Sequence, residues 1–528
     1  MPEYLTPGVY VEEFEMGARP IEGVGTSTGG FLGVTERGPT DRPRLVTSFA
    51  QFNRIFGKYL DEKKSYLAYA IDGFFSNGGQ RCFIGRIVPE GSKFALKTFD
   101  SVTFKSAGEG TCGNRTAINI ENSSSDDPKK PLEEGKRIFK LTIAYWNETP
   151  DFSKLTNENS NKPEYKDIME KAYVEMFDNL SEDQTSPDHY IRKLGDPLNN
   201  LSNLVVLSGS GRPSNTGGFV PLEGGEDGAE LLRDDFRGKT DSKPGDKRGL
   251  EAFKEIDEIN NINIPDLQIV NSDLRKQIVD DLLSHCEEMK DRFAIIDVPL
   301  GSKDVGSLTI DASGARPSKY GALYYPWIKI YDPLTRSQKP KPAGGYVAGI
   351  YARSDIERGV HKAPANELVK GAVDLEFNLT KGEQAMLNPR GINVIRNFPG
   401  RGILVWGART CIIDPLWKYI NVRRLFLYIE ESIDEGTQWV VFEPNDEKLW
   451  ARVKATITQF LTRVWKDGAL MGTKVEEAFF VKCDRTTMTQ DDIDNGKLIC
   501  VIGIAPVKPA EFVIFRIAQW QGGSAATE

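Results

Sequence analysis

Apolar positions recur with helical spacing in the C-terminal third of the chain, where they predict two helices. The first should begin at a capping Asn421 and end near Gly436. The second should begin at Asn445-Asp446 and stop at Gly468. The apolar stripes of the two helices are Val422, Leu425, Phe426, Ile429 and Ile433, and Leu449, Val453, Ile457, Phe460, Leu461 and Val464. Each helix is therefore expected to pack on a core through one face.

Upstream, shorter apolar runs predict strands that alternate with helices. Residues 31–34 and 82–88 are typical of buried strands, and helices are expected from a capping Ser48 and over residues 67–75. Residues 261–265, a helix capped at Ser272-Asp273 and residues 293–298 form a strand–helix–strand unit. A crossover of this kind makes its two strands parallel. The proline-containing tract 337–345 is interpreted as a linker.

Between these parts, residues 98–207 follow a different pattern. Residues 116–121 and 138–146 alternate as strands do. Polar, proline-punctuated tracts lie at 122–131 and 157–163, and such tracts favour surface loops. This stretch is predicted to be a β-rich, peripheral module.

Both ends of the chain favour extended arms. Residues 4–13 are β-prone but have little neighbouring sequence to pair with, and a loose tract, 17–28, follows them. In 511–520, Phe512, Ile514, Ala518 and Trp520 face one way and Val513, Phe515 and Ile517 face the other. Apolar residues on both faces indicate a strand covered on two sides. Left uncovered, such a terminal strand promotes aggregation, whereas exchange between copies makes it a specific contact.

The overall composition narrows the class of protein. At 528 residues the chain should divide into several domains, and its net charge of −9 argues against nucleic acid or anionic lipid as the main partner. We see no secretion signal and no run long enough to span a bilayer. The six cysteines are scattered without a CxxC pair, and they are interpreted as buried apolar residues in a reducing cytoplasm.

Enzymatic chemistry is largely missing. The Gly-rich tract 26–33 lacks the Gly-Lys-Ser/Thr of a phosphate loop, and 209–214 has Ser where a dinucleotide turn needs its third Gly. His189, His285 and His361 come without a Gly-x-Ser-x-Gly elbow, so packing or surface roles are expected for them. We expect no cofactor and no metal site.

Asp266 and Asp297 are the one alternative that favours catalysis. They lie at or just past the ends of the two strands of the strand–helix–strand unit, where open α/β sheets place ligands. Paired carboxylates there could hold Mg²⁺ or act as acid and base. However, Pro265 and Pro299 flank them, and Asp-Pro neighbourhoods also turn chains without any chemistry.

Ten short motifs resemble the family of contractile phage tail sheath proteins. Four lie near the start: 4–13 (YLTPGVYVEE), 35–39 (TERGP), 76–79 (SNGG) and 82–86 (CFIGR). Six lie in the C-terminal part: 343–355 (AGGYVAGIYARSD), 358–366 (RGVHKAPAN), 388–393 (NPRGIN), 406–410 (WGART), 419–424 (YINVRR) and 438–445 (QWVVFEPN). Their order and spacing are more specific than any single motif, and the stretch from 92 to about 337 resembles the family less.

The resemblance implies a structural protein rather than an enzyme: a sheath subunit of a phage tail, a tailocin or an extracellular injection system. Its hexameric rings would stack around an inner tube and contract, with arms adding strands to neighbouring inner domains. The expected partners are copies of itself or a sheath paralogue, the tube protein, and baseplate and terminal cap proteins. Assembly is expected in the bacterial cytoplasm. The alternatives left open are another self-assembling tail tube or baseplate protein, and a hydrolase.

The expected fold is a multidomain α/β and α+β chain. It combines a mixed-sheet inner domain with swapped β-arms, a βαβ middle domain that the resemblance likens to a subtilisin scaffold without its triad, and a β-rich outer insertion. The expected boundaries are 1–20 (arm), 21–97 (inner and middle region), 98–207 (outer domain), 208–342 (α/β domain), 343–508 (C-terminal inner domain) and 509–528 (arm). The expected inter-subunit residues are Val9, Tyr10, Val11, Phe512, Val513, Ile514, Phe515 and Ile517.

Arg423 and Arg424 are candidate tube-facing residues. Cations near a helix N-terminus are mildly unfavourable, which an external anionic partner would explain. The alternative is an intramolecular pair with Glu430 or Glu431.

Overall fold

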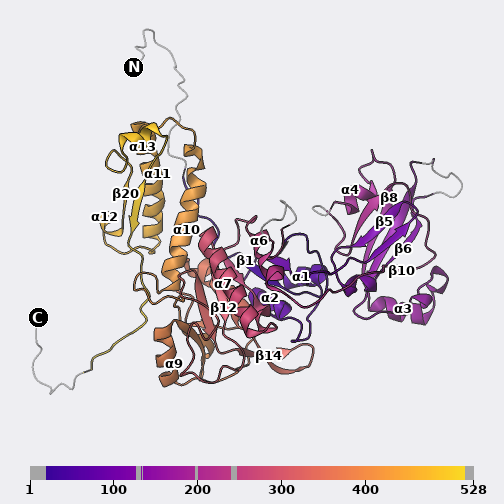
Figure 1. Ribbon diagram of the computed structural model, residues 1–528, viewed down its shortest axis with the longest axis horizontal. Coiled ribbons are helices and arrows are strands. Elements are labelled where there is room, and N and C mark those ends of the chain that lie inside the picture. Colours follow the sequence, from indigo (N-terminus) through magenta and orange to yellow (C-terminus); the bar gives the residue numbers. More distant parts are fainter. Residues whose placement is uncertain (1–19, 127–132, 134, 197–199, 240–246, 518–528) are drawn as a thin grey trace, which may run out of the picture. The chain divides into compact units, whose positions relative to one another are not determined.

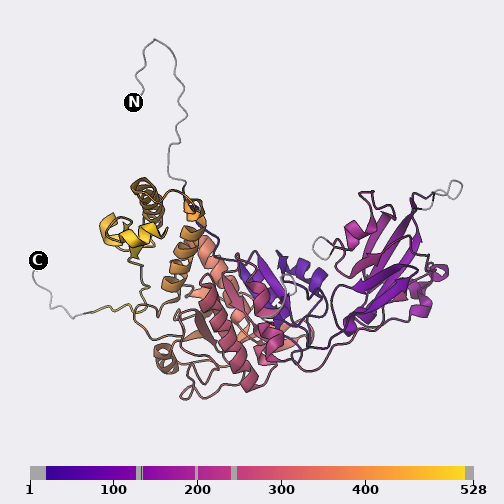
Figure 2. The ribbon, with the colours of Figure 1, turned by 45° about the horizontal axis from the view of Figure 1, so that its top comes forward.

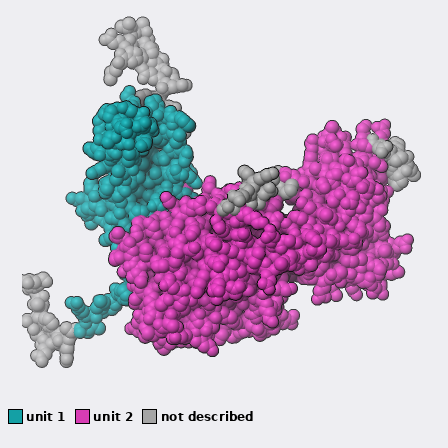
Figure 3. Space-filling model, in the orientation of Figure 1, with its two compact units in different colours: residues 1–23, 361–363, 424–528 teal, residues 24–360, 364–423 magenta. Residues whose placement is uncertain are grey.

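The computed structural model describes residues 20–126, 133, 135–196, 200–239 and 247–517. The chain divides into two compact units (Figure 3). Unit 1 comprises residues 1–23, 361–363 and 424–528, and unit 2 comprises residues 24–360 and 364–423. Each unit is described by itself below.

Unit 2 is built on a nine-stranded mixed sheet (Figure 1). In spatial order its strands are β16 (Glu367–Leu368), β19 (Gly402–Val405), β18 (Ile392–Phe398), β13 (Gly321–Tyr325), β12 (Phe293–Asp297), β11 (Asn261–Asn263), β1 (Gly29–Gly33), β3 (Cys82–Arg86) and β2 (Arg44–Val46). The strands from β18 to β3 pair in parallel, and antiparallel strands close both edges. The central strands β1, β11, β12 and β13 are buried throughout, as expected for a sheet covered on both faces.

Helices cover the two faces of this sheet. One face carries α2 (Leu67–Ser76) and α8 (Gly344–Arg358), and the opposite face carries α6 (Gly249–Phe253) and α7 (Ser272–Met289). The two faces are told apart by register, because neighbouring residues of one strand point to opposite sides. Thus Gly29 of β1 faces Phe74 of α2, whereas Gly30 faces Phe253 of α6.

The predicted strand–helix–strand unit is confirmed. β11 and β12 pair in parallel, with Asn261 opposite Phe293, and α7 connects them. The helix is capped one residue earlier than expected, because the Asn271 side chain accepts a hydrogen bond from the Leu274 amide at 2.9 Å. Ser48 caps α1 (Phe49–Phe56) as predicted.

Glycines in α8 bring it unusually close to α2. A Cβ on Gly345 would lie 2.4 Å from the Cα of Ala70, and one on Gly349 would lie 2.4 Å from the carbonyl oxygen of Phe74. The glycine-rich motif at 343–355 therefore encodes a helix whose backbone packs directly on another helix. The expected linker at 337–345 is wrong, since β15 (Ser337–Lys341) and the start of α8 occupy it.

The β-rich insertion forms two antiparallel sheets (Figure 2). One has the order β10 (Val220–Pro221), β6 (Thr116–Asn122), β7 (Ile138–Tyr145), β8 (Tyr173–Ser181); the other has β4 (Leu96–Phe99), β5 (Val102–Ser106), β9 (Val205–Gly209). Its short helices are α3 (Pro163–Glu170) and α4 (Tyr190–Leu194). A core of its own, which includes Phe104, Phe139 and Leu141, lies between these elements. The two strands predicted at 116–121 and 138–146 are confirmed as β6 and β7.

The remaining elements of unit 2 are α5 (Arg233–Arg237), α9 (Lys381–Leu387) and a small sheet of β14 (Ile328–Asp332), β15 and β17 (Asp374–Leu375). The nine-stranded sheet unites strands from 21–97, 208–342 and 343–508, which the expected boundaries assign to three separate domains. Periodicity marks single elements, and it carries no information on which strands pair across hundreds of residues.

Unit 1 holds most of the predicted C-terminal helices. Its elements are α10 (Ile420–Thr437, which begins in unit 2), α11 (Glu447–Lys466), α12 (Val475–Ala478), β20 (Phe479–Lys482), α13 (Gln490–Asp494) and β21 (Val501–Ile504). Asp446 caps α11 through the Leu449 amide at 2.8 Å, as predicted. Asn421 lies inside the first turn of α10, so it does not precede the helix as expected. No described helix is both long and apolar enough to cross a bilayer.

Candidate assembly interface

Asp266, one of the two candidate catalytic carboxylates, is fully buried below the end of β1. Its oxygens accept hydrogen bonds from the amides of Val34 and Tyr66, both at 2.6 Å, and from the Ser65 hydroxyl. Tyr66 precedes α2 and has no capping side chain of its own. Asp266 therefore caps α2 from a distant part of the chain. Burial raises its pKa to about 6, against the effect of these hydrogen bonds.

Asp297 plays the same part for α8. Its carboxylate accepts a hydrogen bond from the Gly344 amide at 2.7 Å, and the Asn263 amide lies 3.4 Å away. Ala343, at the N-cap position of α8, has no side chain that can cap. Burial raises the pKa of Asp297 to about 6, and its hydrogen bonds and nearby Arg275 oppose this rise. A Cβ at Gly344 would meet this carboxylate at 2.5 Å, which explains the glycine there.

These contacts correct the catalytic alternative for Asp266 and Asp297. The two side chains are 0% and 3% exposed, so neither reaches solvent where a substrate could meet it. Their oxygens are occupied by helix-terminal amides, which otherwise lack partners. The position at the ends of parallel strands was predicted correctly, but the role is to fix helices.

Two of the three histidines lie in buried positions that suit packing. His285 is buried, and desolvation together with nearby Arg292 and Lys254 lowers its pKa to about 3. His189 is also buried, beside Tyr190. Within the described ranges, no group of three or more His, Cys, Asp or Glu side chains is arranged to hold a metal ion.

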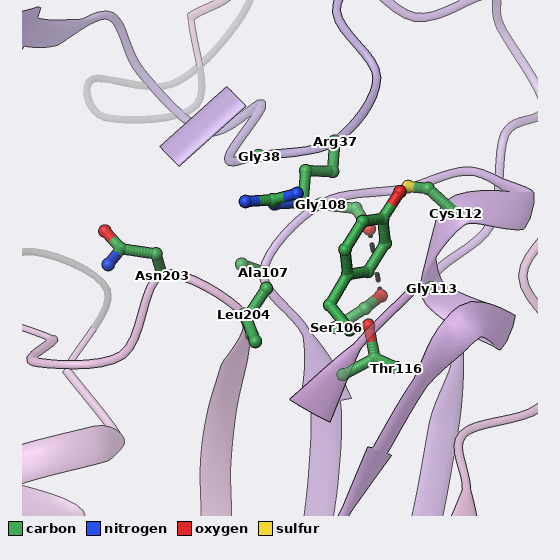
Figure 4. A pocket seen from close by; sticks show the side chains of 11 residues that line it. Arg37, Gly38, Ser106, Ala107, Gly108, Cys112, Gly113, Thr116, Asn203 and Leu204 are labelled. Atoms are coloured by element: carbon green, nitrogen blue, oxygen red, sulfur yellow. Dashed lines mark hydrogen bonds between the residues drawn. The ribbon is translucent and has the colours of Figure 1, made fainter. Parts of the chain in front are cut away.

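A small pocket lies where the insertion joins the central part of unit 2 (Figure 4). Its walls include Arg37, Ser106, Tyr145 and Asn203, and it has room for about one water molecule. Arg37 stacks on Tyr145 at 4.4 Å. Nearby, Arg86 donates to the carbonyl oxygens of Gly38 at 2.6 Å and Glu109 at 2.9 Å. These contacts fill the junction and fix the insertion to the central sheet.

The structure buries both candidate tube-facing arginines. Arg423 and Arg424 are 1% and 3% exposed. The guanidinium of Arg423 lies over the rings of Trp417 at 4.8 Å and Tyr320 at 5.0 Å. Neither side chain is therefore on the surface of the single chain, and aromatic faces stabilise the Arg423 charge. A contact with a tube stays a prediction.

The C-terminal segment is the largest run of exposed apolar side chains among the described residues. Phe512, Val513, Ile514, Phe515 and Ile517 are 68–95% exposed. They form no strand within the single chain, so the strand predicted for 511–520 is absent in its described part. Exposure of consecutive bulky apolar residues is a common feature of interaction surfaces. Val9, Tyr10 and Val11 lie outside the described residues.

Unit 1 also contains a short sheet whose edges suit such a partner. β20 and β21 pair in antiparallel fashion and form a sheet of two strands in the described chain. Phe479 and Val481 are buried, and β20 packs on α11. Phe480 and Val501 are 49% and 43% exposed. A sheet of only two strands is marginal alone and gains from added strands.

The sequence pattern did not single out this sheet. The alternation of buried Phe479 and Val481 with exposed Phe480 and Lys482 was the available signal, but four residues are too few to separate a strand from a helix end. The same sheet brings Cys483 beside Cys500, which appear unrelated in the sequence.

Comparisons with known proteins assign the C-terminal half. The model for the phage tail sheath protein central domain matches residues 247–411, and the model for the phage tail sheath C-terminal domain matches residues 413–519. Together they span just over half of the chain.

Two curated relatives illustrate the sequence similarity. The tail sheath protein of Burkholderia phage BcepMu is 28% identical over 199 residues, which cover 34% of this chain and 41% of that protein. The putative prophage major tail sheath protein of Pseudomonas aeruginosa is 24% identical, over 53% of this chain and 72% of that protein. The chain spans less than half the length of the first three curated relatives that it matches.

Solved structures match almost the whole chain. A chain of the anti-feeding prophage baseplate is 25% identical with a TM-score of 0.56, covering 97% of this chain and 99% of that chain. The contracted helical sheath of the anti-feeding prophage matches with 24% identity, the same coverage and a TM-score of 0.58. The relatives are structural proteins rather than enzymes. The two domain models, the curated sheath relatives and this fold show that the chain belongs to the contractile tail sheath protein family.

Proposed function

We propose that the protein polymerises as stacked hexameric rings around an inner tube, and that these rings contract to drive the tube through a target envelope. The observation that carries this proposal is the exposed apolar segment 512–517, which a single chain leaves uncovered. Membership of the sheath family supports it, and solved relatives include a sheath complex of an extracellular contractile injection system in its contracted state.

Strand exchange is the proposed link between subunits. The C-terminal segment of one copy would add to the edge of the β20–β21 sheet of another, and the segment at 1–20, of which 1–19 lie outside the described residues, would make a second link. Main-chain hydrogen bonds give such a contact its affinity, and alternate side chains give it specificity. Phe512 and Ile514 would cover one face of the joined sheet, and Val513, Phe515 and Ile517 the other.

Two links per subunit suit a contractile lattice. A short added strand contributes a handful of main-chain hydrogen bonds, each worth about 1 kcal/mol net. One link alone is therefore weak, but several in a closed ring act multivalently. The linked strands can stay paired while rigid bodies repack between two states, so contraction needs no nucleotide hydrolysis.

The proposed partners follow from this arrangement. They are other copies of the chain or a sheath paralogue, an inner tube protein, and baseplate and terminal cap proteins. The match to a chain in an anti-feeding prophage baseplate structure supports contact with a baseplate. The insertion, whose two sheets have their own core, is proposed to project outward from the ring. The curated sheath relatives and the two sheath domain models favour a sheath role for the chain over a tube or baseplate role.

Truncation tests strand exchange. Removing residues 509–528 should abolish tubules in negative-stain micrographs and leave the circular dichroism spectrum unchanged, because no described residue of the segment belongs to a helix or strand. Phe512→Ser with Ile514→Ser should weaken assembly in the same direction. Leu201→Ser with Leu232→Ser is the matched control, since these side chains are 58% and 54% exposed in unit 2. Long tubules from the truncated, folded chain would exclude the mechanism.

A further inference from the structure

Two cysteines of unit 1 flank a pair of antiparallel strands: Cys483 follows β20 directly, and Cys500 directly precedes β21. The ladder of β20 and β21 places Phe479 opposite Ile504 and Lys482 opposite Val501. Continued by one residue beyond the ladder, this register sets Cys483 opposite Cys500. Sixteen residues separate them in the sequence, including α13 (Gln490–Asp494), so their proximity arises only from the folded sheet.

The register also sets the type of this pair. The Ala505 amide donates to the carbonyl oxygen of Ala478 at 2.8 Å, which makes 478 and 505 a hydrogen-bonded pair. In an antiparallel ladder the two pair types alternate, so Lys482 and Val501 are hydrogen-bonded and Cys483 and Cys500 are not. Non-hydrogen-bonded partners have Cα atoms about 4.5 Å apart, with close side chains. Disulfides span about 4.4–6.8 Å between Cα atoms.

The two thiols are near enough for each to shift the pKa of the other: Cys500 lowers the pKa of Cys483, and Cys483 raises the pKa of Cys500. Cys483 is 4% exposed, on the same buried face of β20 as Phe479 and Val481, whereas Cys500 is partly exposed. Burial, together with the Cys483 thiol, raises the pKa of Cys500 to about 12, and burial also raises the pKa of Cys483. A thiol with a raised pKa carries little thiolate at neutral pH, so the pair reacts slowly with oxidants there.

The other cysteines differ from this pair. Cys82, Cys112, Cys286 and Cys411 are buried in unit 2 and, like the pair, are free thiols in this structure. Cys82 lies in β3 and Cys286 in α7, each surrounded by the apolar core. They behave as small apolar side chains. Only unit 1 brings two thiols together across a strand pair.

We propose that Cys483 and Cys500 form an intrachain disulfide when the protein passes from a reducing to an oxidising environment. The oxidant is a small-molecule disulfide. The thiolate of the more accessible Cys500 attacks it, forms a mixed disulfide and releases one small thiol. Cys483 then gives up its proton and attacks the Cys500 sulfur, which releases the second small thiol. Two protein thiols are oxidised to one S–S bond, and one small disulfide is reduced to two thiols.

The bond closes a loop that joins the two strands of the sheet. It constrains the unfolded chain and ties β20 to β21 at the end away from Ala478 and Ala505. The inference does not depend on polymerisation, because it concerns residues of one chain. If strand exchange also holds, oxidation stabilises the sheet that receives the exchanged strand.

The experiment oxidises the purified full chain with glutathione disulfide at about pH 9, where more thiolate is present. Thiols counted after denaturation should fall from the six of the reduced chain to four. Non-reducing peptide mapping should find 483 joined to 500. The thermal midpoint should rise on the order of 5 °C, and reductant should reverse the rise.

Three variants make the result specific. Cys500→Ser should keep five thiols, Cys483→Ser can lose at most the Cys500 thiol to bound glutathione, and neither should show the thermal shift. Cys112→Ser, a buried cysteine of unit 2, should still lose two thiols and gain the shift. Six thiols after oxidation, a disulfide that joins other cysteines, a disulfide between two chains, or an unchanged midpoint in the oxidised chain would each overturn the proposal.

Discussion

At the scale of single residues, the buried carboxylates carry the clearest consequence for pH. Asp266 and Asp297 have pKa values near 6 in the fold, above the 3.8 of a free side chain. The folded chain therefore holds protons that the unfolded chain releases between about pH 4 and pH 6. Their contribution to stability falls as pH rises through this window and is constant above it. The cause is the cost of burying a charge.

The predicted loss of stability with rising pH can be tested with Asp297→Asn. Asparagine keeps one oxygen for the Gly344 amide but cannot ionise, so the substitution should cost less at pH 7 than at pH 4, by roughly 2 kcal/mol. Denaturation midpoints of the variant and the natural chain across this range measure the difference. Asp304→Asn is the control of opposite sign, since hydrogen bonds from Ser307 and Gly306 lower the pKa of Asp304. A cost that grows with pH at position 297 would refute the assignment.

Arg423 offers a second residue-scale prediction. Arg423→Glu places a carboxylate against the faces of Trp417 and Tyr320 in a buried site, which should destabilise the isolated chain by about 3 kcal/mol or more. Arg423→Lys keeps the charge and should cost less. Thermal unfolding without any tube protein measures both. If Arg423→Glu leaves the melting curve unchanged and only reduces tube co-assembly, a contact of Arg423 with the tube is favoured over a packing role.

At the scale of elements, the close approach of α8 to α2 makes a sharp packing prediction. Gly345→Ala forces a methyl group against the Ala70 backbone and should destabilise unit 2 by about 1–3 kcal/mol or more. Gly382→Ala in α9 is the matched control, because the nearest atom to its Cβ is the Thr380 hydroxyl at 3.9 Å. That change should be neutral or stabilising by about 0.5–1 kcal/mol. Equal effects in thermal unfolding would contradict the packing account.

The elements also show what a sequence can and cannot predict. Helices α7 and α11 were predictable because capping residues and an apolar stripe agree along each of them. Helix α8 was missed because its glycines and the prolines before it imitate a linker. Its glycines serve tertiary contact, which no local pattern displays. The positions of Asp266 and Asp297 could be predicted from the ends of the strands. Their role could not, because α2 and α8, whose N-termini they cap, are placed beside them only by the tertiary fold.

At the scale of the whole molecule, no site for the hydrolysis of ATP or another substrate is found among the described residues. The purified protein should hydrolyse neither ATP nor ester or peptide substrates, because the two candidate carboxylates are sealed under α2 and α8. Colorimetric phosphate release and a chromogenic ester assay check this. Turnover that survives purification and disappears in Asp266→Asn would overturn the structural role. If the protein hydrolyses nothing, the work of the proposed contraction comes from the difference in free energy between two packings of the same subunits.

The order of strands in the central sheet governs how the chain is made. β1 lies between β3 and β11, and β11 is synthesised more than two hundred residues after β1. At about 5–20 residues per second a ribosome needs on the order of 10–45 s to supply it. During that interval β3 is available to pair with one edge of β1, while the other edge still lacks its partner β11. The insertion has its own core and can fold meanwhile. Slow translation, or release of the chain before Asn261, therefore leaves the edge of β1 unpaired. Fragments that end before Asn261 should aggregate through this edge.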